Sequence, residues 1–348
     1  MHTRHSFGRF NRWIVIGAVV LRLATEPAIT QPIGQALTRL RTQPLFARAM
    51  LYLEFGCSSQ YPAVTPEPGQ ITVKKPAEEA PTQAAQGTVA APTQTSQPLT
   101  FTEADSEGIH IVSTCSYTVD KAELLNRPLA GDFSGDGPKI LIVHTHASEA
   151  YTPESADDYD PSGDYHTMDT DYNVVRVGTE MAQVFEAHGI SVIHDTSIND
   201  AAGYSDAYDR MADTIAGYLE EYPSIQMVLD VHRDAYEGVD GQPGGNVVTV
   251  DGEESAQVML VMGTDESGQY HPNWQDNLSC ALKTQAVLQR DYPELCRDLV
   301  LRRIRYNQNQ TPCSMLVEVG ASGNTLSQAL VAARHFARAV CQVIESET

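Results

Sequence analysis

Short apolar runs that alternate with helical segments constrain the fold of this 348-residue chain more than any other feature of its sequence. The runs have the length of buried strands in a parallel sheet and lie at residues 139–143, 190–193, 225–231 and 314–319. Segments with helical spacing of apolar residues lie between and after them, at residues 177–185, 207–222, 273–290 and 326–344. Strands that alternate with helices predict an α/β fold, a three-layer sandwich built on a mainly parallel, twisted sheet.

Two further strand predictions concern the margins of this sheet. Residues 109–112 are short and mostly β-branched, which is typical of an edge strand. Residues 247–250 and 258–262, with the turn-forming pair Asp251-Gly252 between them, predict a β-hairpin whose second strand starts late.

The N-terminal region differs from the rest of the chain in charge. The formal net charge of the whole chain is −22, which argues against a nucleic-acid partner because phosphate binding needs a basic face. The first 50 residues nevertheless have Glu26 as their one acidic residue, against the arginines Arg4, Arg9, Arg12, Arg22, Arg39, Arg41 and Arg48. A basic N-terminus before an acidic body is typical of an inside-positive membrane anchor.

The apolar part of this region is short. Residues 13–21 (WIVIGAVVL) are closed by Arg22, whereas a membrane helix needs about 20 apolar residues and a signal-peptide core roughly 7–15. We expect residues 1–57 to be an N-terminal anchor or signal region that places the rest of the chain outside the cytoplasm, attached to the cell membrane. An amphipathic N-terminal helix that packs on another surface is the alternative.

A change in composition separates this region from a globular part. Residues 58–105 are dominated by Pro, Thr, Ala and Gln, as in APTQAAQGTVAAPTQTSQP, and contain too few large apolar residues to offset the entropy of ordering. We expect a flexible linker there and a globular domain over residues 106–348. The six cysteines form no CxxC pair, so they imply neither a metal knuckle nor a dense disulfide framework.

The first candidate site motif follows the run at 139–143. His144, Thr145 and His146 come directly after it, and Glu149 stands three residues beyond His146. Imidazole nitrogen and carboxylate oxygen are both good zinc donors, and residues three apart in a tight turn can converge on one ion. On an extended backbone both rings face the same side, so either histidine can be the ligand while the other orients it or contacts substrate. The simple structural alternative is a pair of buried histidines with satisfied hydrogen bonds.

The second motif closes the run at 225–231. His232 would supply a further ligand from a distant strand and leave a fourth position for water. Asp230 or Asp234 could accept a hydrogen bond from the second ring nitrogen of a ligating histidine. Arg233 could hold a substrate carboxylate or a developing oxyanion. The alternative is a polar surface turn.

The third motif is Glu318, a carboxylate inside the apolar run at 314–319. A buried carboxylate without a partner is costly, so this residue needs an ion pair, a metal or a chemical task. Near a zinc site it could accept a proton from water and pass it to a departing amine. The alternative is a buried ion pair with Arg303 or Arg305.

These motifs resemble those of the stage II sporulation protein P family, which is related to zinc-dependent N-acetylmuramoyl-L-alanine amidases. The matching segments lie within residues 109–345 and read ILIVHTHASEAYTP, GISVIHDTSIND, VLDVHRDAYEG and RYNQNQTPCSMLVEVGASGNTLSQAL. The resemblance implies a Zn²⁺ ion held by His146, Glu149 and His232, with Glu318 as the acid–base group. Related amidases place their acidic ligand later in the chain, which leaves Asp169 and Asp171 as alternatives to Glu149.

The resemblance also implies what the domain acts on. We expect cleavage of stem peptides from the glycan strands of peptidoglycan during sporulation engulfment, with cross-link endopeptidase activity as a further family trait. The implied partner is the lytic transglycosylase stage II sporulation protein D, and the implied topology is a membrane-anchored N-terminus. The rival interpretations are a carboxypeptidase-like zinc peptidase, in which Arg233 binds a terminal carboxylate, and a wall-binding scaffold without turnover.

Overall fold

The computed structural model describes residues 99–155, 157, 159–161, 165–238 and 241–347. The predicted anchor or signal region at 1–57 lies outside these residues, and so does most of the predicted linker at 58–105. At the end of that stretch, helix α4 (Glu103–Gly108) begins after Thr102, whose side chain caps it. Within the described part of the chain, no helix is both long enough and apolar enough to cross a membrane.

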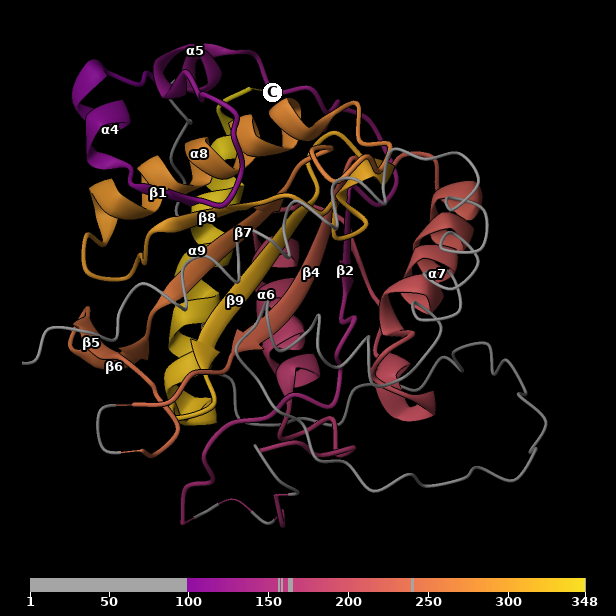
Figure 1. Ribbon diagram of the computed structural model, residues 1–348, viewed down its shortest axis with the longest axis vertical. Coiled ribbons are helices and arrows are strands. Elements are labelled where there is room, and N and C mark those ends of the chain that lie inside the picture. Colours follow the sequence, from indigo (N-terminus) through magenta and orange to yellow (C-terminus); the bar gives the residue numbers. More distant parts are fainter. Residues whose placement is uncertain (1–98, 156, 158, 162–164, 239–240, 348) are drawn as a thin grey trace, which may run out of the picture. The chain divides into compact units, whose positions relative to one another are not determined.

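A seven-stranded sheet forms the centre of the domain (Figure 1), with the strand order β1-β8-β7-β9-β4-β2-β3. Every neighbouring pair is parallel except β7 and β9, which run antiparallel. The predicted mainly parallel sheet is therefore confirmed, and the strand predicted near 109–112 lies at its edge. The strands are β1 (Ile111–Ser113), β2 (Ile140–Val143), β3 (Val192–His194), β4 (Met227–Asp234), β7 (Val258–Gly263), β8 (Leu299–Arg302) and β9 (Met315–Ala321).

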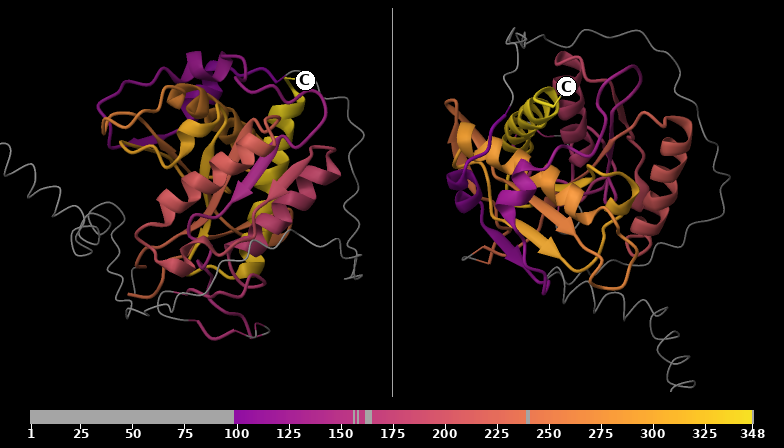
Figure 2. Two further views of the ribbon diagram at one scale, coloured as in Figure 1. Left: turned by 90° about the vertical axis from the view of Figure 1, so that its right-hand side faces the viewer. Right: turned by 90° about the horizontal axis from the view of Figure 1, so that it is seen from above.

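Helices cover both faces of the sheet. Residues alternate between the faces of a strand, so Ile140 and Ile142 of β2 belong to the larger core, while Leu141 and Val143 belong to a smaller core on the opposite face. Helix α7 covers the smaller core and lies apart from the other long helices in Figures 1 and 2. The predicted three-layer arrangement is confirmed. The long helices are α6 (Val174–Ala187), α7 (Ala207–Glu221), α8 (Trp274–Asp291) and α9 (Leu326–Glu345).

Shorter elements complete the domain. Helix α5 packs against α8 near the start of the globular part. Two 3₁₀ segments precede α7 and β9, respectively: Asn199 of the first donates to the turn after β2, and Gln308 of the second bonds to β7. These elements are α5 (Lys121–Asn126), η1 (Asn199–Ala202) and η2 (Gln308–Gln310).

The predicted hairpin is wrong in its second strand. Strand β5 (Val247–Val250) pairs antiparallel with β6 (Glu253–Ala256), not with residues 258–262. Asp251 and Gly252 form the turn and both have positive φ, as a two-residue hairpin turn of this kind requires. Residues 258–263 instead form β7, which is buried along its whole length inside the main sheet. The start of β6 is polar and exposed and gives no apolar signal, whereas the longer apolar run at 258–262 does.

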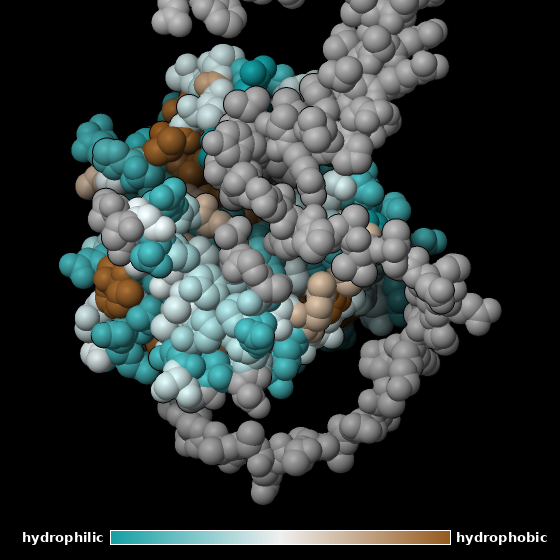
Figure 3. All heavy atoms as spheres, turned by 60° about the horizontal axis from the view of Figure 1, so that its bottom comes forward, coloured by the Kyte–Doolittle hydropathy of each residue, from teal (hydrophilic) through white to brown (hydrophobic). Residues whose placement is uncertain are grey.

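The surface at the lower end of Figure 1 is mainly polar. Figure 3 shows this end turned toward the viewer, and the atoms that are not drawn in grey are mostly hydrophilic, with hydrophobic residues in small separate groups. Among the described residues the exposed large apolar side chains are few and scattered: Val112, Tyr117, Met168, Val247 and Tyr270. Single exposed apolar residues of this kind are normal on a monomer surface.

Candidate metal centre

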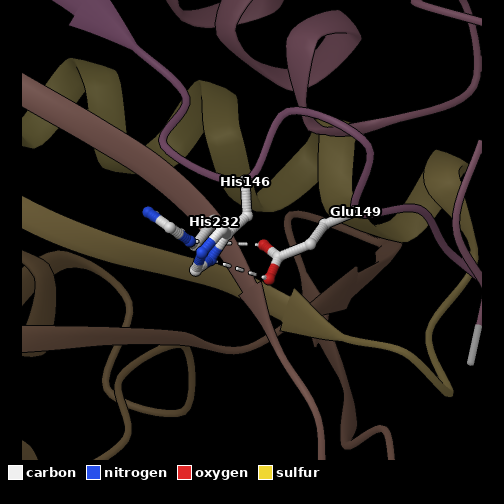
Figure 4. Close-up of side chains that lie close together, drawn as sticks. All are labelled: His146, Glu149 and His232. Atoms are coloured by element: carbon white, nitrogen blue, oxygen red, sulfur yellow. Dashed lines mark ion pairs between the residues drawn. The ribbon is translucent and has the colours of Figure 1, made fainter. Parts of the chain in front are cut away.

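Three predicted ligands converge where β2 ends beside β4. His146 and Glu149 lie on the turn after β2, and His232 lies on β4 (Figure 4). One donor atom of each residue lies within 4.8 Å of the others, and the three residues are only 3–5% exposed. The Nδ1 atoms of His146 and His232 lie 3.7 Å and 3.3 Å from the two carboxylate oxygens of Glu149. Their ring centroids are 5.2 Å apart, so one ion can reach both imidazoles.

The donor set suits a zinc ion. Two imidazoles and one carboxylate are one of the ligand sets found in catalytic zinc sites, which keep a further position open. Burial lowers the pKa of His146 to about 3, so its ring is neutral and has a lone pair for a metal. The ring of Tyr204 stacks on His146 with centroids 3.8 Å apart, which fixes the imidazole in place. These residues therefore fit the zinc ion that the motifs predict.

Asp230 contacts both His232 on β4 and the turn that carries His146. Its Oδ1 atom lies 3.0 Å from Nε2 of His232, an ion-pair approach rather than an aligned hydrogen bond. The same carboxylate accepts hydrogen bonds from the backbone N and the Oγ1 of Thr145, at 2.8 Å and 2.6 Å. The carboxylate of Asp230 thus contacts His232 on the same strand and also fixes the turn that carries His146. Of the two carboxylates expected beside a ligand histidine, Asp230 is the one that contacts His232.

The charge of His232 follows from its surroundings. Burial by itself would lower its pKa, but the carboxylates of Asp230 and Glu149 raise the pKa of His232 well above its usual value. The same contacts hold the pKa of Glu149 below its usual value, against the effect of burial. In the metal-free protein His232 is therefore a cation between two carboxylates. A metal bound to its Nδ1 must displace that proton.

Glu318 lies beside this cluster on β9, where it is the residue paired with His232 of β4. Its Oε2 atom is buried and has no hydrogen-bond partner among the described residues. Burial raises the pKa of Glu318 to about 8. The alternative of an ion pair is not realised: Arg303 pairs with Glu266, and Arg305 donates to the carbonyl of Tyr270.

Arg233 donates hydrogen bonds to Glu149 and to backbone carbonyls in the segment that follows β2. Its backbone N donates to Oε2 of Glu149 at 3.1 Å, and its side-chain Nε and Nη2 donate to the carbonyls of Ala150 and Tyr165. The residue is 4% exposed. These contacts favour a role in positioning Glu149 over the expected role in holding substrate or an oxyanion.

Asp234 and His144 lie away from the three ligands. Asp234 accepts a hydrogen bond from Arg297 at 2.6 Å. His144 contacts the carbonyl of Val231 through Nδ1 at 3.0 Å and His194 through Nε2 at 2.9 Å. His146 is therefore the histidine of this pair that lies in the cluster, and β2 ends at Val143, where the chain turns instead of staying extended.

The alternative acidic ligands are not brought to the cluster. Asp169 and Asp171 are exposed in the turn before α6, where the carboxylate of Asp169 accepts a hydrogen bond from the backbone of Asp171. Among the described residues the His146–Glu149–His232 group is the single cluster of at least three metal-type side chains.

Several residues at this site were missed by sequence reasoning. Asp200 of η1 accepts hydrogen bonds from the backbone N and the hydroxyl of Ser148, and Asn199 donates to the carbonyl of Thr145. Tyr204 and Tyr208 contact the ligand histidines through their rings. Asn199, Asp200 and Tyr204 lie between β3 and α7, and Tyr208 lies in the first turn of α7. Asn199 and Asp200 belong to the family-like segment GISVIHDTSIND, but the spacing of these residues does not mark them as neighbours of a metal centre.

The chain is thus an α/β protein with a buried His–Glu–His cluster that could hold a metal ion, beside the carboxylate of Glu318. Residues 56–341 match the model of the family described as stage II sporulation protein P. The chain belongs to this family.

Related proteins share only part of the sequence or the fold. The stage II sporulation protein P of Bacillus subtilis (strain 168) is 26% identical over 206 residues, which are 56% of this chain and 48% of that protein. The chain thus matches about half the length of this relative. Two solved structures are also similar: the CwlD amidase of Clostridioides difficile in complex with the GerS lipoprotein (15% identity, TM-score 0.38, 60% of this chain and 98% of that one), and the N-acetylmuramoyl-L-alanine amidase AmiC2 of Nostoc punctiforme (14% identity, TM-score 0.34, 60% and 97%).

Proposed function

We propose that this chain is a zinc-dependent peptidoglycan hydrolase that acts in sporulation, and that it cleaves the amide between N-acetylmuramic acid and the stem peptide. One observation carries the proposal: donor atoms of His146, Glu149 and His232 converge within 4.8 Å, with Glu318 on the neighbouring strand. Membership of the stage II sporulation protein P family supports the substrate class.

The residues at the site have distinct tasks in this reaction. When bound, a zinc ion held by His146, Glu149 and His232 supplies Lewis-acid polarisation of the scissile carbonyl and makes a water molecule more acidic. Glu318 accepts the proton of the attacking water as the C–O bond forms. It then gives that proton to the stem-peptide nitrogen as the C–N bond breaks. Asp230 holds His232, and Arg233 holds the loop of Glu149, throughout both steps.

The state of Glu318 fits this task. A carboxyl group with a pKa raised by burial to about 8 is protonated at neutral pH in the metal-free protein. A cation beside it favours the ionised form and brings the pKa down toward the working range of a base. The buried, unpartnered Oε2 atom is then available to a water molecule or to the leaving nitrogen.

The contacts of Arg233 weigh against the carboxypeptidase interpretation. That interpretation needs a cation that is free to bind a terminal carboxylate. The Arg233 guanidinium instead donates to the backbone carbonyls of Ala150 and Tyr165. The scaffold interpretation predicts that the chain binds muropeptides without cleaving them. Digestion of purified muropeptides distinguishes this outcome from hydrolysis.

Digestion of purified muropeptides by the full chain tests the proposal. We expect zinc-loaded wild type to free the lactyl group of muramic acid, which mass spectrometry detects, and both His146→Ala and His232→Ala to lose zinc and cleavage together. Release of the C-terminal residue of the stem peptide alone would identify a carboxypeptidase. Binding of muropeptides without any released peptide would identify a scaffold.

Location and partner form the last part of the proposal. We further propose that the chain acts outside the cytoplasm, is attached to the cell membrane through residues 1–57 and cooperates with stage II sporulation protein D. The basic, partly apolar sequence of residues 1–57 motivates the attachment, and the family resemblance of the sequence motifs motivates the partner. Membrane fractionation of the full chain and co-purification with that transglycosylase test these two points.

A further inference from the structure

Tyr208 stands against both ligand histidines. It belongs to the first turn of α7, and its ring meets His146 edge-on, with centroids 5.4 Å apart and planes at 84°. The same ring lies nearly parallel to that of His232, with centroids 6.5 Å apart and planes at 13°. Tyr208 is therefore next to the metal centre, although it comes from a helix on the smaller core of the sheet.

The backbone around Tyr208 is fixed from two sides. Asn307, which adopts a left-handed backbone conformation, donates its side-chain amide to the carbonyl of Tyr208 at 2.7 Å. Asn199 donates to the carbonyl of Ala207 at 2.9 Å, and the same amide also holds the carbonyl of Thr145 in the ligand turn. The side-chain amide of Asn199 thus bonds both the start of α7 and the turn that carries His146. This keeps the Tyr208 ring in place beside His146.

The hydroxyl of Tyr208 is not used by the fold. Within the described part of the chain it makes no hydrogen bond, and its side chain is half-buried rather than enclosed. A phenol carries its proton at neutral pH and is a good donor. Arg233, the residue first expected to stabilise an oxyanion, has its guanidinium turned to the carbonyls of Ala150 and Tyr165. The Tyr208 hydroxyl is therefore a neutral donor that the fold does not use, whereas the Arg233 guanidinium, expected at this role, is already hydrogen-bonded.

We infer that the Tyr208 hydroxyl donates a hydrogen bond to the scissile carbonyl oxygen and to the oxyanion that develops from it. This inference rests on the proposed amide hydrolysis and adds a catalytic residue to it. The hydroxyl keeps its proton throughout, so the transfer of the water proton through Glu318 to the leaving nitrogen is unchanged. Donors aimed at developing negative charge act mainly on the transition state, so their loss lowers kcat more than it raises KM.

The Tyr208→Phe variant of the full, zinc-loaded chain tests the inference, because it keeps the ring contacts and removes the hydroxyl alone. We expect kcat for muropeptide cleavage to fall about 10²–10³-fold, with KM, zinc content and Tm unchanged. Tyr218→Phe is the matched control: it makes the same change on the same helix, about 15 Å further along its axis, and should leave kcat at the wild-type value.

A second measurement separates catalysis from support of the fold. A phosphinate mimic of the muropeptide carries the tetrahedral oxygen, and Tyr208→Phe should weaken its binding by the same factor as kcat/KM. Equal kcat in wild type and Tyr208→Phe, or a loss of activity that follows a loss of zinc or of Tm, would overturn the inference. A wild-type chain that cleaves nothing contradicts the proposed function itself, whereas an active wild type beside an equally active variant contradicts only the role of Tyr208.

Discussion

His232 of β4 and Glu318 of β9 are paired residues on neighbouring parallel strands. Paired residues of adjacent strands project from the same face of a sheet, so this register alone sets a candidate ligand and a candidate acid–base group side by side. The register then shifts before Asp234 pairs with Ala321, and Gly320, with φ of +72°, lies in the extra length of β9. A Cβ at Gly320 would approach Ala256 to 2.9 Å, so the irregularity that follows the site requires glycine.

Replacement of Glu318 by Gln separates the metal from the proton transfer. The amide has nearly the same shape but cannot accept the proton of water, so kcat should fall about 10²–10⁴-fold. Zinc content should stay at the wild-type level because Glu318 is not one of the three convergent donors. Atomic absorption and muropeptide kinetics on the same sample check this. A variant that cleaves at the wild-type rate would remove Glu318 from the mechanism.

Replacement of Asp230 by Asn should weaken the metal site without removing a ligand. The variant loses the charge next to Nε2 of His232 and disturbs the anchoring of Thr145. Loss of such an outer partner typically costs 10–100-fold in metal affinity, which a chelator competition assay measures. Asp234→Asn is the control, because Asp234 pairs with Arg297. Equal zinc affinity of both variants would show that Asp230 has no special role.

Zinc affinity should rise with pH. The pKa of His232 is raised in the folded, metal-free protein by Asp230 and Glu149, despite burial, and this proton must leave when the metal binds. Affinity should therefore increase about tenfold per pH unit while pH stays below the raised pKa. Titrations from pH 6 to 8, in buffers of different ionisation enthalpy, should report release of about one proton. A flat profile without proton release would contradict a protonated His232.

The same pKa shift has a consequence for the metal-free fold. A raised folded-state pKa means that the folded protein binds the proton more tightly than the unfolded chain does. This contribution to stability is fully present below about pH 6.5, the ordinary histidine pKa, and is lost as pH rises through the raised value. Chelator-treated protein should accordingly show a decline in Tm on the alkaline side that His232→Ala lacks.

Two helix glycines should respond in opposite ways to alanine. A Cβ at Gly178 of α6 would lie 2.6 Å from Nε2 of both His144 and His194, so Gly178→Ala should destabilise by about 1–3 kcal/mol through overpacking. A Cβ at Gly217 of α7 would meet nothing within 4 Å. Gly217→Ala should stabilise by roughly 0.5–1 kcal/mol, since alanine is the better helix residue. Urea unfolding of both variants measures the contrast.

The parts of the fold that could be predicted from the sequence are those whose burial requires a run of apolar residues. Strands β2, β4 and β9 contain apolar runs that lie buried in the sheet. His146 and Glu149 lie on the turn after β2, whereas His232 lies within β4. Strand β8 and the short helices α4 and α5 were missed because each is too brief to show a period. The hairpin was misassigned because the burial of β7 produced a stronger signal than the polar start of β6.

The candidate site could be predicted only where metal-binding or acid–base residues lie inside an apolar strand or shortly after its end. His146, Glu149, His232 and Glu318 are polar residues next to or inside apolar runs, and the structure brings the first three together. Tyr208, in contrast, reaches the site because α7 packs over the smaller core, a tertiary relation that no spacing along the chain encodes. The turn that separates His144 from His146 likewise depends on η1 contacts, such as the hydrogen bond from Asn199 to Thr145.

A zinc ion held by His146 and His232, which are 86 positions apart in the sequence (232 − 146), would link two remote parts of the chain and so stabilise the folded domain. An unfolded chain offers no such pair of donors at one point, so the ion binds the native form selectively and stabilises it by mass action. A free zinc concentration 100 times the dissociation constant adds about 2.7 kcal/mol. Survival of newly made protein against proteases should therefore track the local supply of zinc.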